Sequence, residues 1–173
     1  SKIKASKTFD NATSCSSENS LVMVEAIYND MLGALTNVNG CLLTPQETAV
    51  LQTALWHKGH LNAAMLAKPV AVMCEVAGIT RKAACEADFL MVEETGAGAE
   101  FPFSGEKMAL VLTLYRAADF DHAKQVARTI LDYQGKGHSL SLHSQSSDRA
   151  ELLGLEMPVC RVIVNQAHCF ATG

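Results

Sequence analysis

The chain has 173 residues and a net charge of −4, with 14 basic residues scattered among 18 acidic ones. This pattern offers no basic surface for nucleic acid, and no apolar run is long enough to span a membrane. The length fits one domain with a substantial core. Six cysteines without the spacing of a disulfide framework, and the lack of a basic and then apolar leader, favour reduced thiols in the cytoplasm.

Cys15 lies in a polar run that ends at Ser20, just ahead of a helical pattern of apolar residues. Apolar side chains recur at spacings of three and four at Leu21, Val24, Tyr28, Met31, Leu32 and Leu35. We therefore expect a helix to begin near Cys15, with Ser14, Ser16 or Ser17 as its N-cap. The positive end of a helix dipole favours a thiolate, so Cys15 is a candidate nucleophile. The alternative is a small buried cysteine with a structural role.

Four further helices follow from capping and stop signals. Thr44, Pro45 and Glu47 predict the start of one helix, which Gly59 can end. Another runs from Pro69 to Gly78. Asp119 predicts the cap of a third, with Gly135 as its stop, and Ser147 or Asp148 opens a shorter one.

Short continuous apolar runs in the second half indicate strands that are covered on both faces. They are residues 89–92, 108–114, 140–142 and 159–164. Strands that alternate with helices predict a three-layer αβα domain with a mostly parallel sheet. In such sheets the active site is expected at the carboxyl ends of the strands.

The segment around Cys15 resembles the nucleophile motif of the aldehyde dehydrogenase superfamily, specifically its CoA-acylating branch. The resemblance rests on residues 7–11 (KTFDN) and 14–20 (SCSSENS), and it continues in order through residues 105–112, 135–139 and 161–166. Together these segments span nearly the whole chain. The closing residues 165–173 (NQAHCFATG) are most similar to the acylating sulfoacetaldehyde dehydrogenase subfamily.

The resemblance implies that residues 1–173 are the nucleophile-bearing catalytic domain of a longer enzyme, cut from a preceding cofactor-binding domain and a following oligomerising tail. It implies NAD or NADP as cofactor, coenzyme A as acyl acceptor, a small aldehyde as substrate, and a homodimer or homotetramer. Alone, such a domain is expected to be inactive. The oxyanion would be held by the backbone N–H of Cys15 and by an asparagine upstream of this chain.

Glu106 and His138 are the other candidate site residues. The resemblance matches Glu106 to a glutamate that accepts hydrogen bonds from the ribose hydroxyls of the nicotinamide half of the cofactor. One departure is that Ala109 and Leu110 stand where the family has a small residue and then proline. His138, in the glycine-rich turn 135–138, matches a turn near the active site, and its role stays open between site histidine and surface histidine.

Two other patterns give little support for a binding site. Residues 93–99 (EETGAGA) imitate a phosphate-binding loop, but Phe101 and Pro102 stand where its third glycine and its helix should be. His57 and His60 share a spacing without a cysteine pair, so we expect no metal site.

The leading interpretation is the catalytic domain of an NAD(P)-dependent CoA-acylating aldehyde dehydrogenase, in which a Cys15 thioester is transferred to coenzyme A. The alternatives are a hydrolytic aldehyde dehydrogenase, or a cysteine-dependent hydrolase or acyltransferase that uses Cys15 and His138. A non-catalytic α/β interaction module, with Cys15 structural, is a third class.

Overall fold

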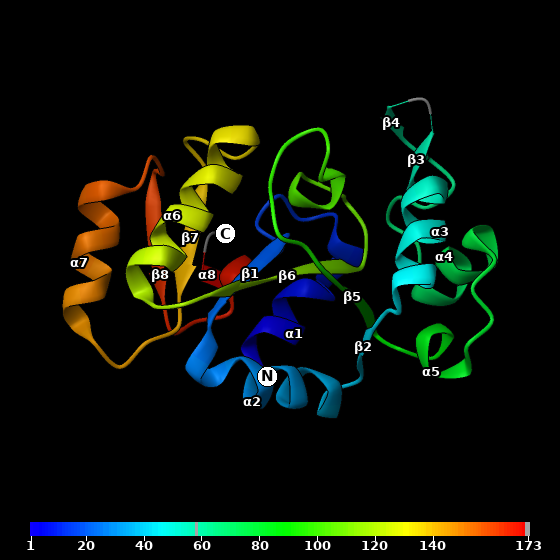
Figure 1. The fold of residues 1–173 in the computed structure, drawn as a ribbon, viewed down its shortest axis with the longest axis horizontal. Coiled ribbons are helices and arrows are strands. Elements are labelled where there is room, and N and C mark those ends of the chain that lie inside the picture. Colours follow the sequence, from blue (N-terminus) through cyan, green and yellow to red (C-terminus); the bar gives the residue numbers. More distant parts are fainter. Residues whose placement is uncertain (58, 172–173) are drawn as a thin grey trace.

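The computed structural model describes residues 1–57 and 59–171. Its main sheet has four strands in the order β1-β6-β5-β2, and every neighbouring pair is parallel (Figure 1). The strands are β1 (Ser20–Val24), β2 (Gly40–Leu42), β5 (Phe89–Glu93) and β6 (Val111–Ala117). The register pairs Ser20 with Thr113 and Leu90 with Val111.

Two smaller pairs complete the strands of the described residues. β7 (Ser139–Leu142) and β8 (Arg161–Val164) form a parallel pair. β3 (Trp56–His57) and β4 (His60–Leu61) form an antiparallel pair.

Helices flank the main sheet on both sides. α2 contacts β1, β2 and β6, while α6 contacts β1 and β6, and Figure 1 shows α2 and α6 on opposite sides of β6. The α-helices are α1 (Lys2–Lys7), α2 (Glu25–Asn37), α3 (Pro45–Leu55), α4 (Val70–Ala77), α5 (Lys82–Cys85), α6 (Phe120–Tyr133), α7 (Ser147–Glu156) and α8 (His168–Ala171). The 3₁₀ helices are η1 (Phe9–Ala12) and η2 (Pro102–Ser104). The predicted α/β class with a mostly parallel sheet is confirmed.

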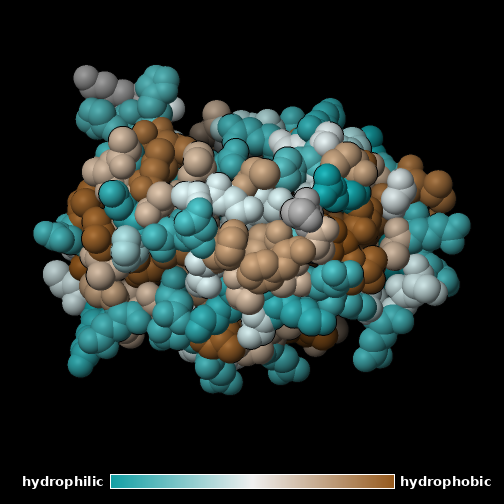
Figure 2. Space-filling model, turned by 180° about the vertical axis from the view of Figure 1, so that it is seen from behind, coloured by the Kyte–Doolittle hydropathy of each residue, from teal (hydrophilic) through white to brown (hydrophobic). Residues whose placement is uncertain are grey.

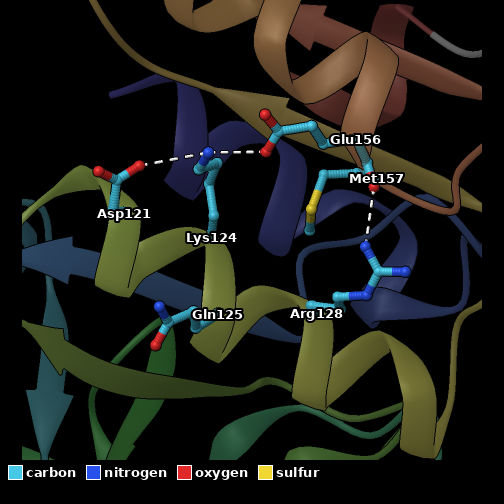
Figure 3. A pocket seen from close by; sticks show the side chains of 6 residues that line it. All are labelled: Asp121, Lys124, Gln125, Arg128, Glu156 and Met157. Atoms are coloured by element: carbon cyan, nitrogen blue, oxygen red, sulfur yellow. Dashed lines mark hydrogen bonds and ion pairs between the residues drawn. The ribbon is translucent and has the colours of Figure 1, made fainter.

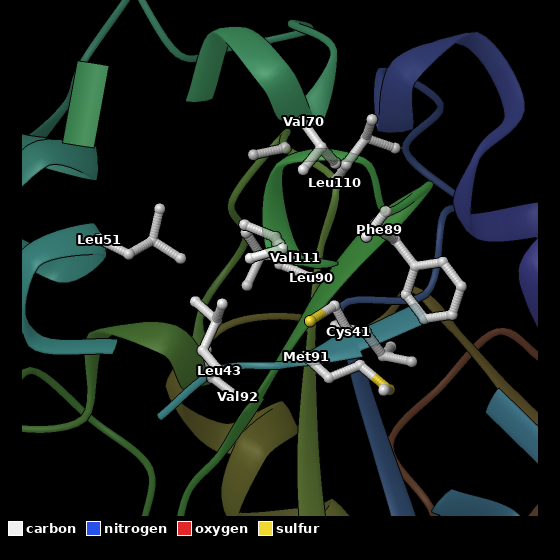
Figure 4. Close-up of a cluster of buried hydrophobic side chains, with 14 of the residues drawn as sticks. Cys41, Leu43, Leu51, Val70, Phe89, Leu90, Met91, Val92, Leu110 and Val111 are labelled. Atoms are coloured by element: carbon white, nitrogen blue, oxygen red, sulfur yellow. The ribbon is translucent and has the colours of Figure 1, made fainter. Parts of the chain in front are cut away.

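The core lies where β5 is enclosed between its neighbours and the helices α3 and α4 (Figure 4). Phe89, Leu90, Met91 and Val92 are all fully buried, so successive side chains of β5 point into apolar surroundings on both faces. This is the pattern that predicted a strand covered on both sides.

Most local helix signals are also confirmed, but Gly59 does not end the helix that begins at Pro45, since α3 ends at Leu55 and Trp56–His57 form β3. Thr44 Oγ1 accepts a hydrogen bond from the Glu47 N–H, and Glu47 Oε2 accepts one from the Thr44 N–H, which completes a capping box. Gly78 ends α4 in the left-handed region at φ 74°. Asp119 caps α6 by accepting from the N–H of His122.

The helix expected to begin near Cys15 is wrong. Residues 20–24 form β1, and α2 begins only at Glu25. Leu21 and Val24 fit a helical spacing, but the uninterrupted run Leu21-Val22-Met23-Val24 pairs in parallel with β6. This pairing with a strand more than 90 residues away overrides the local periodicity. Ser14, Ser16 and Ser17 therefore cap no helix.

The strand predicted over residues 108–114 begins later, at Val111, and ends at Ala117. Met108 has a positive φ of 45°, and its carbonyl accepts from the N–H of Ala67 instead of joining the sheet. The strand predicted over 159–164 similarly begins at Arg161.

Ion pairs join α6 to the end of α7 around a hollow of about 420 Å³ (Figure 3). Lys124 Nζ lies 2.7 Å from a Glu156 carboxylate oxygen and 3.2 Å from Asp121 Oδ1, and Arg128 donates to the Glu156 carbonyl at 3.0 Å. The charged groups that line this hollow are already paired with one another by these contacts, so we assign the hollow a structural role.

The surface seen from behind mixes hydrophilic and hydrophobic side chains, with several apolar areas left open (Figure 2). The most exposed large apolar residues are Leu155 at 78% and Phe170 at 59%. Within the described residues, no helix combines the length and the apolar character needed to cross a membrane.

Glu47→Gln tests the junction of α3 with the loop that leads into α5. Arg81 donates to both Glu47 oxygens at 2.7 Å, and these hydrogen bonds lower the pKa of the Glu47 carboxyl to about 2. Because this pKa is depressed, the stabilisation is present above the ordinary glutamate pKa and is lost as the pH falls toward 2. We expect the variant to lose about 1 kcal/mol of unfolding free energy at pH 7 and less at pH 3, measured by urea unfolding.

Glu86→Gln is the matched control, because Glu86 pairs with Lys82 only at 3.8 Å and 67% of its side chain is exposed. Equal losses in the two variants, or a loss at Glu47 that does not depend on pH, would contradict the assigned ion pair.

Candidate active site

The segment ahead of Cys15 has a strained backbone. Asp10, Asn11 and Ala12 have positive φ values of 48°, 50° and 62°, a region that residues with a Cβ rarely adopt. The hydroxyl of Thr13 donates to the Asp10 carbonyl at 2.7 Å and to its carboxylate at 2.6 Å. These contacts stabilise the left-handed backbone conformation of the residues that precede Cys15.

Cys15 lies in a turn that follows this path and precedes β1. The N–H of Ser17 donates to the Ser14 carbonyl at 2.9 Å, and the N–H of Ser16 donates to the Ser14 hydroxyl at 3.3 Å. Cys15 is exposed, and its Sγ lies 4.0 Å from the Ser16 hydroxyl. A polar turn rather than a helix N-terminus therefore presents the thiol.

Cys15, Glu106 and His138 all line one cavity of about 460 Å³. The turns before β1, β6 and β7 supply these three residues, while helices α2, α6 and α7 supply apolar side chains such as Ile27 and Leu131. The structure thus brings together the residues that the sequence singled out separately. A thiol, a carboxylate and an imidazole around one cavity form a plausible set for covalent chemistry on a bound ligand.

The site lies at the amino ends of the strands, so the expected location at their carboxyl ends is wrong. Cys15, Glu106 and His138 all precede the strands that follow them, β1, β6 and β7. Because β1 and β6 are parallel, the segments that enter them reach the same edge of the sheet. The functional side chains sit on long segments that enter the strands rather than on loops that leave them.

Lys107 ties two of these entering segments together. Its side chain is fully buried, and Nζ donates to the carbonyls of Phe103, Gly105 and Asn19 at 2.7, 3.0 and 3.1 Å. Its backbone N–H donates to Asn19 Oδ1 at 3.2 Å. Burial lowers the pKa of this amine well below its ordinary value. Lys107 therefore fixes the segment of Glu106 against the segment that carries Cys15.

A second amine, that of Lys7, is fully buried, and its Nζ donates to no described residue. Burial lowers its pKa to about 7, against the opposing attraction of Glu18 and Glu106. Burial also raises the pKa of Glu18, while Ser6 and the backbone of His168 favour its charged form. No hydrogen bond of ordinary geometry reaches the Glu18 oxygens within the described chain, and burial is the largest cause of the pKa shift of both Lys7 and Glu18.

Glu106 is exposed, and its backbone is held in place by a hydrogen bond to the residue that follows α6. The N–H of Glu106 donates to Gln134 Oε1 at 2.8 Å, and Gln134 follows the last turn of α6. A Cβ on Gly105 would lie 2.6 Å from the same oxygen, so a glycine is needed for this close approach. The exposed carboxylate on the cavity suits an acceptor for ligand hydroxyl groups.

His138 is the exposed end of a row of polar groups. Its Nδ1 lies 3.0 Å from the Ser139 hydroxyl, which lies 2.7 Å from Nε2 of His168. His168 is only 7% exposed, and its pKa is lowered to about 4, mostly by burial and then by His138, Arg161 and His143. The His168 imidazole is therefore neutral at pH 7.

Sequence reasoning missed several residues that line this cavity, among them Glu18, Asn19, Gln134, Ser139 and His168. The one available signal was that Ser139 adjoins His138, whereas His168 meets Ser139 across 29 residues of chain.

The loop after β5 is closed by a bridge between Gly98 and Phe101 and leads into η2, so no helix N-terminus faces it as in a dinucleotide-binding loop. Among the described residues, no three histidine, cysteine, aspartate or glutamate side chains gather as metal ligands would.

Known proteins that are similar to this chain include acylating aldehyde dehydrogenases. No family model matches the chain. The acylating sulfoacetaldehyde dehydrogenase of Cupriavidus necator is 54% identical over 172 residues, which are 99% of this chain and 35% of that protein. A sulfoacetaldehyde dehydrogenase of Acholeplasma is 34% identical and is matched over 99% of this chain and 36% of its own length.

A solved structure is similar over the same extent. An acetylating aldehyde dehydrogenase of Geobacillus thermoglucosidasius superposes with a TM-score of 0.92 at 31% identity, covering 97% of this chain and 37% of that one. This chain is a homologue of the acylating aldehyde dehydrogenases. The resemblance to the CoA-acylating branch, drawn from the segments around Cys15, is thereby confirmed. The chain spans 35–37% of the length of these three relatives.

Lys107→Met tests the role assigned to the buried amine. The substitution keeps the apolar stem but removes the Nζ donor from three carbonyls. Those of Phe103 and Asn19 still accept from Thr113, so we expect a loss of about 2 kcal/mol in unfolding free energy. Thermal and urea unfolding would measure it. Lys7→Met is the matched control, because Lys7 is equally buried but its Nζ donates to no described residue. A loss in Lys7→Met as large as in Lys107→Met would show that the hydrogen bonds of Lys107 are not what matters.

Proposed function

We propose that this chain is the nucleophile-bearing domain of a longer NAD(P)-dependent, CoA-acylating aldehyde dehydrogenase, and that the enzyme converts a small aldehyde to an acyl-CoA. The observation that carries the proposal is the exposed Cys15 on the same cavity as Glu106 and His138, in a chain 54% identical to an acylating sulfoacetaldehyde dehydrogenase. Sulfoacetaldehyde is accordingly the first substrate to test.

Cys15 would act as the covalent nucleophile. Its Sγ attacks the aldehyde carbonyl carbon, and the new C–S bond gives a thiohemiacetal. Loss of hydride from that carbon leaves a thioester on Cys15, and transfer of the acyl group breaks the C–S bond and returns the thiolate. The backbone N–H of Cys15, with an asparagine from outside this chain, is the proposed donor to the developing oxyanion.

Two coenzymes complete this chemistry: when bound, the nicotinamide accepts the hydride and coenzyme A supplies the thiol that takes the acyl group. Glu106 fits the first of them, because its exposed carboxylate lies on the Cys15 cavity and can accept hydrogen bonds from ribose hydroxyls. The hydrogen bond from the Glu106 N–H to Gln134 fixes the backbone position from which this carboxylate extends.

His138 is the proposed acid–base group of the cavity. Its Nδ1 faces Ser139, which leaves Nε2 as the ring nitrogen that can exchange a proton with the Cys15 thiol. Through this exchange His138 would accept the proton of the Cys15 thiol as Sγ attacks the carbonyl carbon.

We further propose a cytoplasmic enzyme that works as a homodimer or homotetramer. All six cysteines of the chain are free thiols, which suits a reducing compartment. The hydrolytic aldehyde dehydrogenase and the cysteine-dependent hydrolase or acyltransferase, the two alternatives from the sequence, gain no support from the relatives, which include acylating enzymes.

Cys15→Ala in the full-length enzyme should abolish the reaction. We expect NADH or NADPH formation from sulfoacetaldehyde to require coenzyme A, and to fall at least about a thousandfold in the variant because no thioester can form. Cys160→Ala is the matched control, since Cys160 is also exposed but does not line the cavity. Turnover without coenzyme A would instead indicate a hydrolytic dehydrogenase, and equal effects of the two substitutions would remove Cys15 from its role.

Glu106→Gln should weaken binding of the nicotinamide coenzyme. Losing a charged acceptor for ribose hydroxyls is expected to raise KM for NAD(P) roughly tenfold, equivalent to about 1.4 kcal/mol, with a smaller effect on KM for coenzyme A. Initial rates at varied coenzyme concentration measure this. Glu100→Gln serves as control, because Glu100 is exposed on the same loop region but lies off the cavity. An unchanged KM for NAD(P) would contradict the assignment of Glu106.

A further inference from the structure

The polar row behind His138 ends in the interior of the protein. His138 is exposed, Ser139 is half-buried, and His168 is 7% exposed, so the row runs from the cavity wall into the interior. The contacts of 3.0 Å and 2.7 Å are both of hydrogen-bond length, and all three residues line the Cys15 cavity. A ring nitrogen of His138 is thus connected through one hydroxyl to a buried imidazole.

The buried end of the row is held by the segment that leads to the nucleophile. The N–H of Cys169 donates to the hydroxyl of Ser6 at 2.9 Å, and both residues are buried. This contact joins α8 to α1, and α1 leads through η1 into the turn of Cys15. The backbone of His168 also lies close enough to the Glu18 carboxylate to favour its charged form. The same packing therefore places both the histidine row and the thiol.

The chemistry of the row suits a base. A histidine that takes a proton at Nε2 carries N–H groups on both ring nitrogens, so its Nδ1 must then donate. The Ser139 hydroxyl can accept that bond only if it donates its own hydrogen onward, and His168 Nε2 is the group within reach. Because the neutral imidazole of His168 can offer a lone pair there, the row can accommodate a protonated His138.

We propose that Ser139 and His168 are positioning residues, which hold the imidazole of His138 in the orientation and tautomer needed to exchange a proton with the Cys15 thiol. The proposal rests on the proposed function only in assigning that exchange to His138. In the exchange, the proton leaves Cys15 Sγ and joins His138 Nε2, while Nδ1–H keeps donating to the Ser139 hydroxyl and that hydroxyl keeps donating to His168, so no other reactant is needed.

The test is the rate at which iodoacetamide alkylates Cys15, followed from pH 5 to 10 in the full-length protein without coenzymes. A Cys160→Ala background removes the other exposed thiol, and peptide mass spectrometry assigns the product to Cys15. Only the thiolate reacts, so the pH profile reports how well the thiol gives up its proton. His138→Gln should lower the rate at pH 7 roughly tenfold and move the profile to higher pH.

Ser139→Ala and His168→Leu should move the profile in the same direction, lowering the rate at pH 7 by about three- to tenfold. The conservative variants Ser139→Thr and His168→Gln keep a hydroxyl and an amide acceptor, so they should restore most of it. His143→Gln is the matched control, because His143 lines the same cavity but makes no hydrogen bond in the row. Thermal unfolding would show whether His168→Leu folds. If it does not, Ser139→Ala and Ser139→Thr still test the proposal, because Ser139 is only half-buried and its variants are expected to fold.

The decisive comparison is the double variant. Because the two residues act through His138, Ser139→Ala should have no further effect on Cys15 alkylation once His138→Gln is present. An equal effect of Ser139→Ala with and without His138, or a failure of Ser139→Thr to restore the rate, would overturn the proposal. A proton-exchange row supported by alkylation, together with no CoA-dependent aldehyde oxidation, would instead contradict the proposed function alone.

Discussion

The parallel pairing of β1 with β6 is the constraint on which the candidate site depends. The register of Ser20 with Thr113 brings residues that are more than 90 positions apart in the chain to one edge of the sheet. Lys107 reinforces this pairing, since its buried amine donates to carbonyls on the segment that enters β1 and on the segment that enters β6. A shift of one residue in this register would turn every β1 side chain to the opposite face and would move the Cys15 turn away from Glu106.

Much of the fold could be predicted because its signals are local. The capping box of Thr44 and Glu47, the left-handed Gly78 and the Asp119 cap each depend on residues within one turn of helix. The buried strand β5 could be predicted too, because four successive apolar residues leave little choice at its centre. In each case the residues that determine the element lie within the element itself or at its ends.

The errors came where a distant partner decides the structure. The run at residues 21–24 fits both a strand and part of a helix, and only its pairing with β6 settles the question. The three-residue strand β2 is too short to produce a period. His168 has no local signal for its position, because its contact with Ser139 requires β8 and α8 to be folded against β7. For the same reason the structural argument that made Cys15 a candidate nucleophile, a helix N-terminus, is wrong, because β1 follows it and α2 begins only at Glu25.

The site combines several features that are costly for folding within a short stretch of chain. Asp10, Asn11 and Ala12 are in the left-handed region, and the buried Lys7 precedes them with an Nζ that donates to no described residue. Each left-handed residue with a Cβ costs of the order of 1 kcal/mol, so this stretch cannot hold its shape by local preference. It is held by contacts made elsewhere, among them the Thr13 hydroxyl on Asp10 and the Ser6 hydroxyl that receives the N–H of Cys169. Because α8 supplies that last contact and also carries His168, one packing interaction orders both the nucleophile segment and the buried end of the histidine row. The two halves of the candidate chemistry are therefore expected to form together as the chain folds, rather than as independent turns on the surface.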